Sequence, residues 1–442
     1  MDWIKKHGLE SRVMTHEQAV EMIKSGDRVM VGHGTAYPLK LVQAMCARKD
    51  ELEGVEVMHP FIVGAAPHCA PEMEGHFRHV ALFIGPMARQ AIQEGRADYI
   101  PVFLHQNPSL FVNGICPIDV GMVQITPPDD HGFSSYGVSI DVTKPGTDAA
   151  KIVLAEINPQ MPRTLGDSFI HVDHINAFIP VDHPIPDLPL EEVTDTLRQI
   201  GANVASLIED GSVIQMGIGG LPNAIVQFLA EKKDLGIHSE MLSDGVAELF
   251  EKGAVTCARK TLHKGKIVGS FAMGTQKIYK FIDNNPMVQM YPVDYTNHPF
   301  IVAQNERMVA INSAIQVSVT GQVNAESIGW KMYSGIGGQV DFFRGATMAK
   351  DGKAIIALPS TAAGGKVSRI VPNLDLGSIV TTSRYDARYI VTEFGAADLF
   401  GVTERERARR MIAIAHPDFR GWLTEEAEKQ GRNPHYKNYV EA

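Results

Sequence analysis

The sequence predicts an α/β protein made of two related domains, each with an open and largely parallel sheet. Strand-like runs rich in Val and Ile alternate with helical stretches through most of the chain. The 442 residues exceed what one ordinary hydrophobic core organises, so we expect more than one domain. The third observation is an internal repeat, because segments 26–45 and 211–229 follow one pattern.

Each half opens with a helix followed by a strand. The segment THEQAVEMIKSG begins with Thr15 and Gln18, which form the pattern of a capping box, and ends with Gly26, so it predicts a helix. The apolar run DRVMVG then predicts a buried strand. In the second half, EEVTDTLRQIGANVASLIEDG predicts a helix and SVIQMG a strand.

The two repeated segments align with a gap of one residue. Both run from a glycine through an apolar strand to a Gly-x-Gly turn, and then to a proline and an amphipathic helix. Three pairs of residues match: Gly32 with Gly217, Gly34 with Gly219, and Pro38 with Pro222. The proline-rich stretch 180–189 is the expected linker, because successive prolines stiffen an extended chain. We therefore expect domains at 1–186 and 187–442.

Composition excludes several classes of function. The formal net charge of −10 disfavours nucleic acid or an anionic membrane as the main partner. The chain start lacks a signal-peptide pattern, and no apolar stretch approaches the roughly 20 residues that span a bilayer. The cysteines are sparse and form no Cys-x-x-Cys motif, which indicates reduced thiols and a cytoplasmic protein. They are Cys46, Cys69, Cys116 and Cys257.

The loop QMGIGGLPNAI (215–225) has the glycines of a phosphate-binding turn but not a dinucleotide fingerprint. Pro222 stands where the third glycine of that fingerprint belongs, and it suits the first turn of a helix instead. Free backbone N–H groups at a helix start suit a phosphate, a carboxylate or an oxyanion. A tight turn without a ligand is the alternative. A second Gly-Ile-Gly-Gly at 335–338, with no helix signal directly after it, favours backbone brought close to a ligand at two points.

Long segments of the chain resemble the acetyl-CoA hydrolase/transferase family, most closely its branch of 4-hydroxybutyrate and butyryl-CoA:acetate CoA-transferases. The resemblance implies two related Rossmann-like domains of the class I CoA-transferase type, with the active site at their interface. The matching segments are PEMEGHFRH, TPPDDHGFSSYGVS, AEINPQMPRT, QMGIGGLPNA, LGIHSEMLSDG, NSAIQVSVTGQVNAES, SGIGGQVDFFRGA, PSTAAGGKVSRIVP and YIVTEFGAADLFG.

The resemblance also implies roles for individual residues. The catalytic glutamate is Glu240, and the backbone of Gly338 is the oxyanion donor. Coenzyme A contacts fall on the loop Gln215, Met216, Gly217, Ile218 and Gly219, and on Asn297, Ile315, Gly338 and the cation Lys366. The segment VTEFG places Glu393 at the substrate. His33 lies in the N-terminal glycine loop, so it faces either the substrate or only its own turn.

The implied activity is exchange of coenzyme A between an acyl-CoA and a carboxylate. Coenzyme A is then a co-substrate, and no cofactor is permanently bound. The expected glutamate needs no metal and no general base, because a carboxylate with an ordinary pKa is ionised at neutral pH. An acyl-CoA hydrolase using the same glutamate and a ligand-sensing protein of the same fold are the alternatives. We expect a homodimer, the commonest symmetric assembly.

Other readings of these residues stay open at this stage. A loop acid such as Glu240 is ordinarily only solvated, and a strand-end acid such as Glu393 can simply hold a neighbouring loop. His171, His174 and His183 fit no zinc spacing, so we predict no metal site. Butyryl, 4-hydroxybutyryl, acetyl, succinyl and itaconyl groups all suit the implied chemistry. A dicarboxylate would need a further donor, for which Arg163 and His33 are the candidates.

Overall fold

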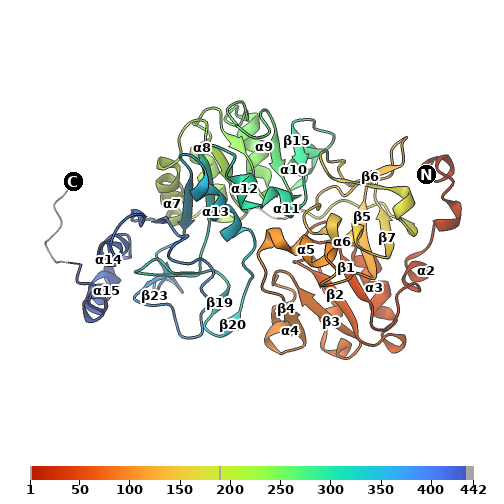
Figure 1. Cartoon of the computed structure of the whole chain (residues 1–442), viewed down its shortest axis with the longest axis horizontal. Coiled ribbons are helices and arrows are strands. Elements are labelled where there is room, and N and C mark those ends of the chain that lie inside the picture. The colour runs from red at the N-terminus through yellow and green to blue at the C-terminus, as the bar shows by residue number, and fades with distance from the viewer. Residues whose placement is uncertain (1, 189–190, 435–442) are drawn as a thin grey trace.

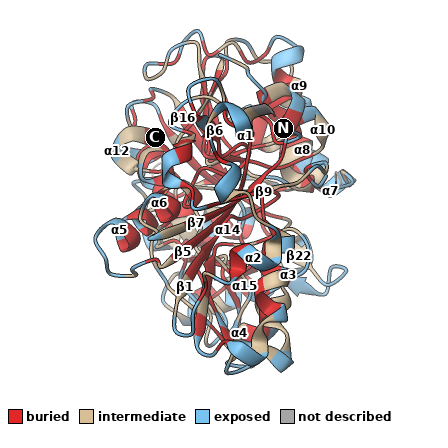
Figure 2. Ribbon diagram, turned by 90° about the vertical axis from the view of Figure 1, so that its right-hand side faces the viewer, coloured by how far each residue is buried: buried red, intermediate tan, exposed pale blue. Residues whose placement is uncertain are grey.

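The computed structural model describes residues 2–188 and 191–434. Two α/β halves lie side by side, the first drawn in red to yellow and the second in green to blue (Figure 1). In the turned view, buried residues gather along the central strands, while exposed residues lie on the outer helices and loops (Figure 2). No helix among the described residues is long and apolar enough to cross a membrane.

The first half holds a seven-stranded sheet in which every pairing is parallel. The inner strand β5 is buried at all six residues, as expected of a parallel strand covered on both faces. In spatial order the strands are β4 (Ala97–Tyr99), β3 (Phe77–Ala81), β2 (Val55–His59), β1 (Arg28–Val31), β5 (Val120–Ile125), β7 (Ile152–Ile157) and β9 (Ala177–Pro180).

The second half holds a six-stranded sheet that is parallel except for its last, antiparallel pair. The spatial order is β11 (Gly236–Ile237), β10 (Val213–Gln215), β16 (Met308–Asn312), β21 (Lys353–Ala357), β25 (Tyr389–Thr392) and β26 (Gly395–Asp398). The strands alternate with helices along most of the chain, so the predicted α/β class is confirmed.

The internal repeat is confirmed by the topology. Strand β1 leads through α3 (Leu39–Ala47) to its neighbour β2, and β10 leads through α8 (Gly220–Leu229) to its neighbour β11. In each sheet, the strand order reverses beside the first of these strands, which is where open α/β sheets bind ligands. Gly34 and Gly219 both have a positive φ, of 60° and 110°, which a side chain rarely adopts.

The remaining helices cover the sheets or form the two chain ends. In the first half they are α1 (Asp2–Lys6), α2 (His16–Val20), α4 (Arg89–Gln93), α5 (Asn107–Val112) and α6 (Thr143–Asp148). In the second half they are α7 (Asp195–Ser206), α9 (Asp244–Glu251), α10 (Gln276–Ile282), α11 (Val293–Thr296), α12 (Pro299–Val302), α13 (Gln339–Met348), α14 (Glu404–Ala413) and α15 (Pro417–Lys429).

The short strands form small sheets outside the two large ones. They are β6 (Phe133–Ser135) with β8 (Phe169–His171), β12 (Met241–Leu242) with β14 (Phe271–Ala272), and β13 (Ile267–Gly269) with β15 (Val288–Met290). The others are β17 (Gln316–Ser318), β18 (Val323–Asn324) and β24 (Ile370–Val371), β19 (Ser327–Ile328) with β20 (Lys331–Met332), and β22 (Thr361–Ala362) with β23 (Val367–Ser368).

The predicted first helix is present but shorter than expected. Thr15 and Gln18 form both hydrogen bonds of the capping box at the start of α2. The helix ends at Val20 rather than near Gly26, because the Arg48 guanidinium donates hydrogen bonds to the carbonyls of Val20 and Ile23. The end of the helix is therefore satisfied by a side chain from α3's C-terminal end and not by a glycine turn.

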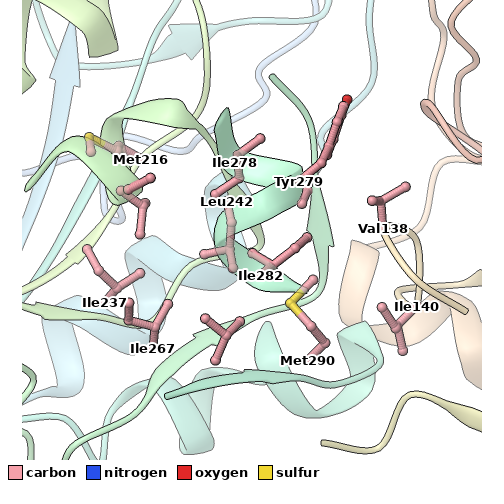
Figure 3. Close-up of a cluster of buried hydrophobic side chains, with 14 of the residues drawn as sticks. Val138, Ile140, Met216, Ile237, Leu242, Ile267, Ile278, Tyr279, Ile282 and Met290 are labelled. Carbon is pink, nitrogen blue, oxygen red and sulfur yellow. The ribbon is translucent and has the colours of Figure 1, made fainter. Parts of the chain in front are cut away.

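The two halves share one continuous hydrophobic core. Val138 and Ile140 of the first half face a cluster from the second half that includes Leu242, Ile282 and Met290 (Figure 3). Backbone hydrogen bonds join the same surfaces, since the Ala272 N–H donates to the Val138 carbonyl over 2.8 Å. A shared core of this kind fixes how the two sheets face each other.

The predicted linker leaves β9 in an extended conformation. Its carbonyls are held by the second half: Gln276 donates to the Ile185 carbonyl over 3.0 Å, and the Tyr279 hydroxyl donates to that of Pro186 over 3.0 Å. The Leu188 N–H donates to the Gly274 carbonyl. The last predicted linker residue, 189, lies outside the described residues, and the boundary at 186 stays a prediction.

Candidate active site

A cavity of about 430 Å³ lies between the two halves. Its walls combine the loop after β1, the loop after β10 and the second Gly-Ile-Gly-Gly segment. Seven of the residues expected at the site line it: His33, Gln215, Met216, Gly217, Ile218, Glu240 and Gly338. Residues from distant parts of the sequence therefore meet at the interface, as the resemblance implied.

Glu240 lies between β11 and β12, and its backbone is fixed by the adjoining strand. Its carbonyl accepts hydrogen bonds from the N–H groups of Ser270 over 2.9 Å and Phe271 over 3.1 Å. The side chain points toward Asn297, whose Nδ2 donates to Glu240 Oε2 over 2.8 Å. Asn297 does not line the cavity but is fully buried behind it, so it holds the carboxylate in place from the protein side.

Gly338 contacts the same carboxylate from the opposite chain segment. Its N–H hydrogen-bonds to Glu240, and a methyl group at position 338 would overlap the carboxylate oxygen. Only glycine permits this approach. The expectation of no helix after this loop is wrong: α13 begins at Gln339, with Gly338 as its N-cap. The large buried apolar side chains of α13 are Val340, Phe342 and Phe343, a pattern that the residues directly after the loop did not reveal.

The charge state of Glu240 differs from the expectation. Burial raises its pKa to about 8, and nearby Asp341 and Asp141 raise it further, while the hydrogen bonds from Asn297 and Gly338 partly offset this. The prediction that this glutamate is simply ionised at neutral pH is therefore wrong for the ligand-free protein. A protonated carboxyl predominates there because the carboxylate has lost its water.

His33 and Asp141 form a buried pair in the lining of the cavity. His33 Nε2 contacts Asp141 Oδ2, and both side chains are almost completely buried. Burial lowers the pKa of His33, and the adjacent carboxylate opposes that change. Burial likewise raises the pKa of Asp141, against the effect of His33 and of hydrogen bonds from Thr143. The pair thus places one donor group from the first half beside the Glu240 region.

The loop after β10 forms the more open wall. Gln215 is positioned by Asn312, whose Nδ2 donates to Gln215 Oε1 over 3.0 Å. Ile218 is 42% exposed at the loop tip. The start of α8 was expected to offer free N–H groups to a ligand. One of them is already used, because the Gly220 N–H donates to Glu191 Oε2 over 2.8 Å. Pro222 lies in the first turn of α8, as predicted.

Besides Asn297 and Gly219, three more residues assigned by the resemblance lie outside the cavity lining. The N–H of Ile315 is used by the Asn324 carbonyl at 2.8 Å, while its neighbour Ser313 lines the cavity. Lys366 is exposed in the turn between β22 and β23. Glu393 accepts hydrogen bonds from the N–H and the hydroxyl of Ser360, over 2.9 and 2.6 Å, so it holds the loop after β21.

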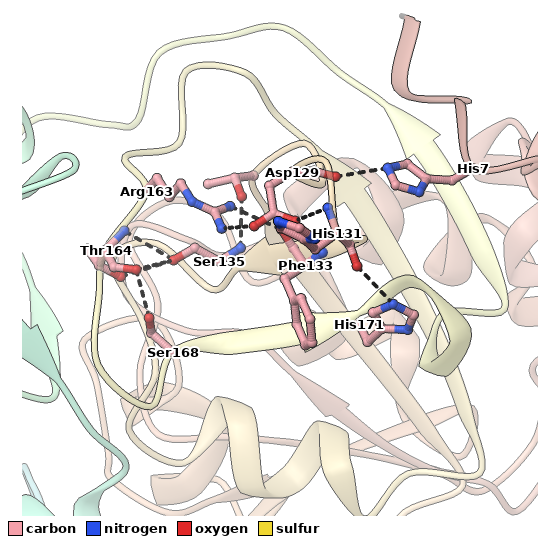
Figure 4. A network of polar contacts seen from close by, with 10 residues as sticks. His7, Asp129, His131, Phe133, Ser135, Arg163, Thr164, Ser168 and His171 are labelled. Atoms are coloured by element: carbon pink, nitrogen blue, oxygen red, sulfur yellow. Dashed lines mark hydrogen bonds and ion pairs between the residues drawn. The ribbon is translucent and has the colours of Figure 1, made fainter. Parts of the chain in front are cut away.

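Arg163 also lies away from the cavity. Its guanidinium donates to Asp129 Oδ2 over 2.6 Å and to the Phe133 carbonyl, within a polar network of the first half (Figure 4). His171 belongs to the same network through the His131 carbonyl. Of the two candidates for an extra substrate donor, only His33 reaches the cavity.

Sequence reasoning missed several residues of the cavity wall. Asp141 pairs with His33, and Arg89 lies over the Tyr333 ring at 3.6 Å while donating to the Tyr333 carbonyl over 2.6 Å. Phe61 and Phe83 form the apolar wall of the first half. No spacing in the sequence joins these positions, because they come from segments that follow three different strands, β2, β3 and β6.

The fold and the cavity define a two-domain α/β protein with a single glutamate carboxyl held by backbone and amide donors between the halves. The chain belongs to the acetyl-CoA hydrolase/transferase family. Residues 4–189 match the family model of the acetyl-CoA hydrolase/transferase N-terminal domain, and residues 274–427 match that of the C-terminal domain.

Individual relatives match over almost their whole lengths. The chain is 50% identical to the 4-hydroxybutyrate coenzyme A transferase of Clostridium kluyveri over 430 residues, which covers 97% of this chain and 100% of that protein. The crystal structure of RipA from Yersinia pestis superimposes with a TM-score of 0.91 at 36% identity, covering 98% and 100% of the two chains. A 4-hydroxybutyrate CoA-transferase from Porphyromonas gingivalis gives a TM-score of 0.83 at 40% identity, covering 95% and 98%.

Proposed function

We propose that this protein is an acyl-CoA:carboxylate CoA-transferase with Glu240 as its nucleophile. The observation that carries the proposal is the Glu240 carboxyl, held by Asn297 and Gly338 at the wall of an interdomain cavity. The two nearby carboxylates that raise the pKa of Glu240 already have partners, since Asp141 contacts His33 and Asp341 contacts His105. A covalent route through one glutamate therefore fits better than acid–base hydrolysis by a pair.

The reaction proceeds through two enzyme-bound acyl species. The Glu240 carboxylate attacks the thioester carbon of an acyl-CoA, the carbon–sulfur bond breaks, and the coenzyme A thiolate leaves a mixed anhydride on the enzyme. The thiolate then attacks the Glu240 carbonyl carbon and expels the first carboxylate. The resulting glutamyl-CoA thioester reacts with a second carboxylate by the same steps in reverse, which regenerates Glu240 and releases a new acyl-CoA.

The donors around Glu240 suit the step at its own carbonyl carbon. When the thiolate attacks there, negative charge develops on a Glu240 oxygen, which already accepts from Asn297 Nδ2. The Gly338 N–H reaches the same carboxylate. Each preorganised donor of this kind is worth roughly 3 kcal/mol of transition-state stabilisation. The site therefore stabilises an oxyanion without a metal ion in any step.

The raised pKa of Glu240 has two opposing consequences. Only the ionised carboxylate attacks, and a pKa of about 8 leaves a minor fraction ionised at neutral pH. A more basic and less solvated carboxylate is in turn a stronger nucleophile. The hydrogen bonds from Asn297 and Gly338 favour the ionised form, which is the form that attacks.

The cavity walls suggest where each part of the substrate lies. We assign the coenzyme A arm to the loop Gln215 to Gly219, because this side is open at Ile218. The acyl tail then faces the apolar cluster of Phe61, Phe271 and Met273. A short chain fits this enclosed end, and His33 there can donate to a hydroxyl or carboxylate on the tail. Butyryl, 4-hydroxybutyryl, acetyl, succinyl and itaconyl groups remain the candidate tails.

One experiment tests the covalent route directly. Protein incubated with acyl-CoA and no acceptor is quenched and analysed by peptide mass spectrometry, with a coenzyme A adduct expected on the peptide that carries Glu240. Glu240→Gln should abolish the adduct and lower turnover by more than about 10⁴-fold, as removal of a nucleophile does. Glu248→Gln on the outer helix α9 is the matched control and should leave both unchanged. An adduct that persists in Glu240→Gln would overturn the proposal.

The same assay separates the alternatives. If free coenzyme A accumulates at the same rate with and without an added acid, the protein is a hydrolase that uses the same adduct. If coenzyme A binds and nothing turns over, it is a ligand-sensing protein. Coenzyme A contacts by Ile315 and Lys366, substrate binding by Glu393, a homodimer and a cytoplasmic location stay predictions within this proposal.

A further inference from the structure

Three buried histidines lie together in the first half, away from every step proposed above. His59 ends β2, His79 lies on β3, and His68 lies in the short turn η3 (Pro67–Cys69) between these strands. Their rings are at most 2% exposed. One nitrogen from each ring lies within 4.8 Å of the others, and no other group of His, Cys, Asp or Glu among the described residues comes together in this way.

The hydrogen bonds of this cluster leave the Nε2 lone pair of His79 without a partner in the described chain. His79 Nδ1 donates to the Val57 carbonyl over 2.9 Å, so the proton lies on Nδ1 and Nε2 carries a lone pair. That His79 Nε2 atom is buried and has no hydrogen-bond partner within the described chain. His59 Nε2 and His68 Nε2 lie 3.1 Å apart, and each of these rings has an unpartnered Nδ1. Burying so many unpaired ring nitrogens is costly.

We propose that His59, His68 and His79 bind one Zn²⁺ ion through their Nε2 atoms. Zinc–nitrogen bonds of about 2.0–2.1 Å in a tetrahedron place two ligand nitrogens about 3.3 Å apart. The separation of 3.1 Å between His59 and His68 already meets this requirement. The Val57 carbonyl supplies the outer hydrogen bond that metal-binding histidines commonly make. The ion replaces the bond between His59 and His68, and the proton of that bond moves to an Nδ1.

The surroundings agree with neutral ligands. All three side chains are almost completely buried, and such surroundings favour the neutral ring that coordinates a metal. Three protein ligands leave the fourth position of zinc to a water molecule. Tyr37, whose ring centroid lies 6.1 Å from that of His59, has a buried hydroxyl without a partner in the described residues, so it is the candidate to hold this water.

The ion would stabilise the loop that carries one wall of the substrate cavity, without contacting the substrate. The chain leaves β2 at His59, forms the cavity wall at Pro60 and Phe61, and returns to the cluster at His68. A metal bound at both ends of the loop from His59 to His68 would hold Phe61 in place. We therefore assign the ion a structural role in stabilising the apolar wall, and no role in bond making or breaking.

The test measures zinc in the full-length protein. Protein stripped with a chelator and dialysed against Zn²⁺ should hold one equivalent per chain by elemental analysis, and Co²⁺ should give the visible absorption of a tetrahedral site. His79→Gln should lower Zn²⁺ affinity by more than the roughly 10–100-fold that loss of an outer partner costs. His76→Gln, three positions earlier and hydrogen-bonded to the Leu52 carbonyl, is the matched control and should bind normally.

Each outcome decides the proposal. Stoichiometric zinc in the wild-type protein and in His76→Gln, lost in His79→Gln, supports it. Absence of zinc in the wild-type protein overturns it, as does equal binding by His79→Gln. If His79→Gln does not fold, crystals of the wild-type protein soaked in Zn²⁺ give the answer, since an anomalous peak must lie between the three rings. A peak elsewhere, or none, refutes the site.

Discussion

The loop after β1 and the loop after β10 are the same unit in two halves, but only one of them is open to solvent. Residues 32–37 after β1 are all buried. In the equivalent loop after β10, Gly217 and Gly219 are half-buried and Ile218 is 42% exposed. A strand, a glycine turn and a helix therefore build the sealed wall of the cavity in one half and its open mouth in the other.

The difference arises from what each loop packs against. In the first half the Thr35 hydroxyl lies 3.2 Å from the Tyr279 hydroxyl, and the centroid of the His33 ring lies 5.3 Å from that of Phe271, so the second half covers this loop. The loop after β10 is flanked by Glu191 and Asn312 of its own half. A repeated fold thus yields a site with two distinct sides, one suited to a small tail and one to a long arm.

The largest expected effect is on the sealed loop. His33→Ala leaves Asp141 buried without its partner, and breaking a buried pair in this way costs about 3–5 kcal/mol of unfolding free energy. Urea denaturation measures the loss. Because burial raises the pKa of Asp141 above its ordinary value, protonation relieves the unpaired charge in acid, so the loss of stability should grow as pH rises through that raised pKa.

The double variant His33→Ala/Asp141→Asn is the control for this prediction. It removes the Asp141 charge that His33→Ala leaves without a partner, so it should recover much of the stability and abolish the added pH dependence. Equal stability of the single and double variants at every pH would mean that the sealed loop does not depend on the ion pair.

The next effect is the pH dependence of catalysis, which reports how far burial and neighbouring carboxylates control the pKa of Glu240. Only the ionised carboxylate attacks, and its pKa is about 8 in the free protein. We expect kcat/KM to rise about tenfold per pH unit below that midpoint and then to level off. The variant Asp341→Asn removes a neighbouring negative charge and should move the midpoint to lower pH. A flat profile between about pH 5 and about pH 7 would contradict the burial of Glu240.

The sequence predicted well those features that lie in continuous segments. The repeat, the capping box at Thr15 and the segment around Glu240 each occupy one stretch, so local patterns and a family resemblance both identify them. The glutamate and Gly338 were assigned by resemblance alone, and the cavity brings them together as that assignment required. Their chemical roles stay predictions.

Features that depend on tertiary neighbours could not be predicted in this way. The pKa of Glu240 follows from burial and from Asp341, which lies far along the chain. The cluster of His59, His68 and His79 arises because β2 and β3 pair in parallel and the turn η3 between them packs against β3, at spacings that match no zinc motif. For the same reason, the sequence could not show that Lys366 is exposed in a hairpin turn.

The smallest expected effect is on the open loop. Ile218→Ala removes an exposed side chain, so the free energy of unfolding should change by no more than about 0.5 kcal/mol. If the coenzyme A arm lies along this loop, the lost apolar contact of about 1 kcal/mol raises KM for acyl-CoA roughly fivefold, with kcat unchanged. Ile328→Ala, 60% exposed on β19 and outside the cavity lining, is the matched control and should leave KM unchanged. Equal KM values for both variants would mean that coenzyme A enters along another wall, and the contrast between the two loops would then concern stability alone.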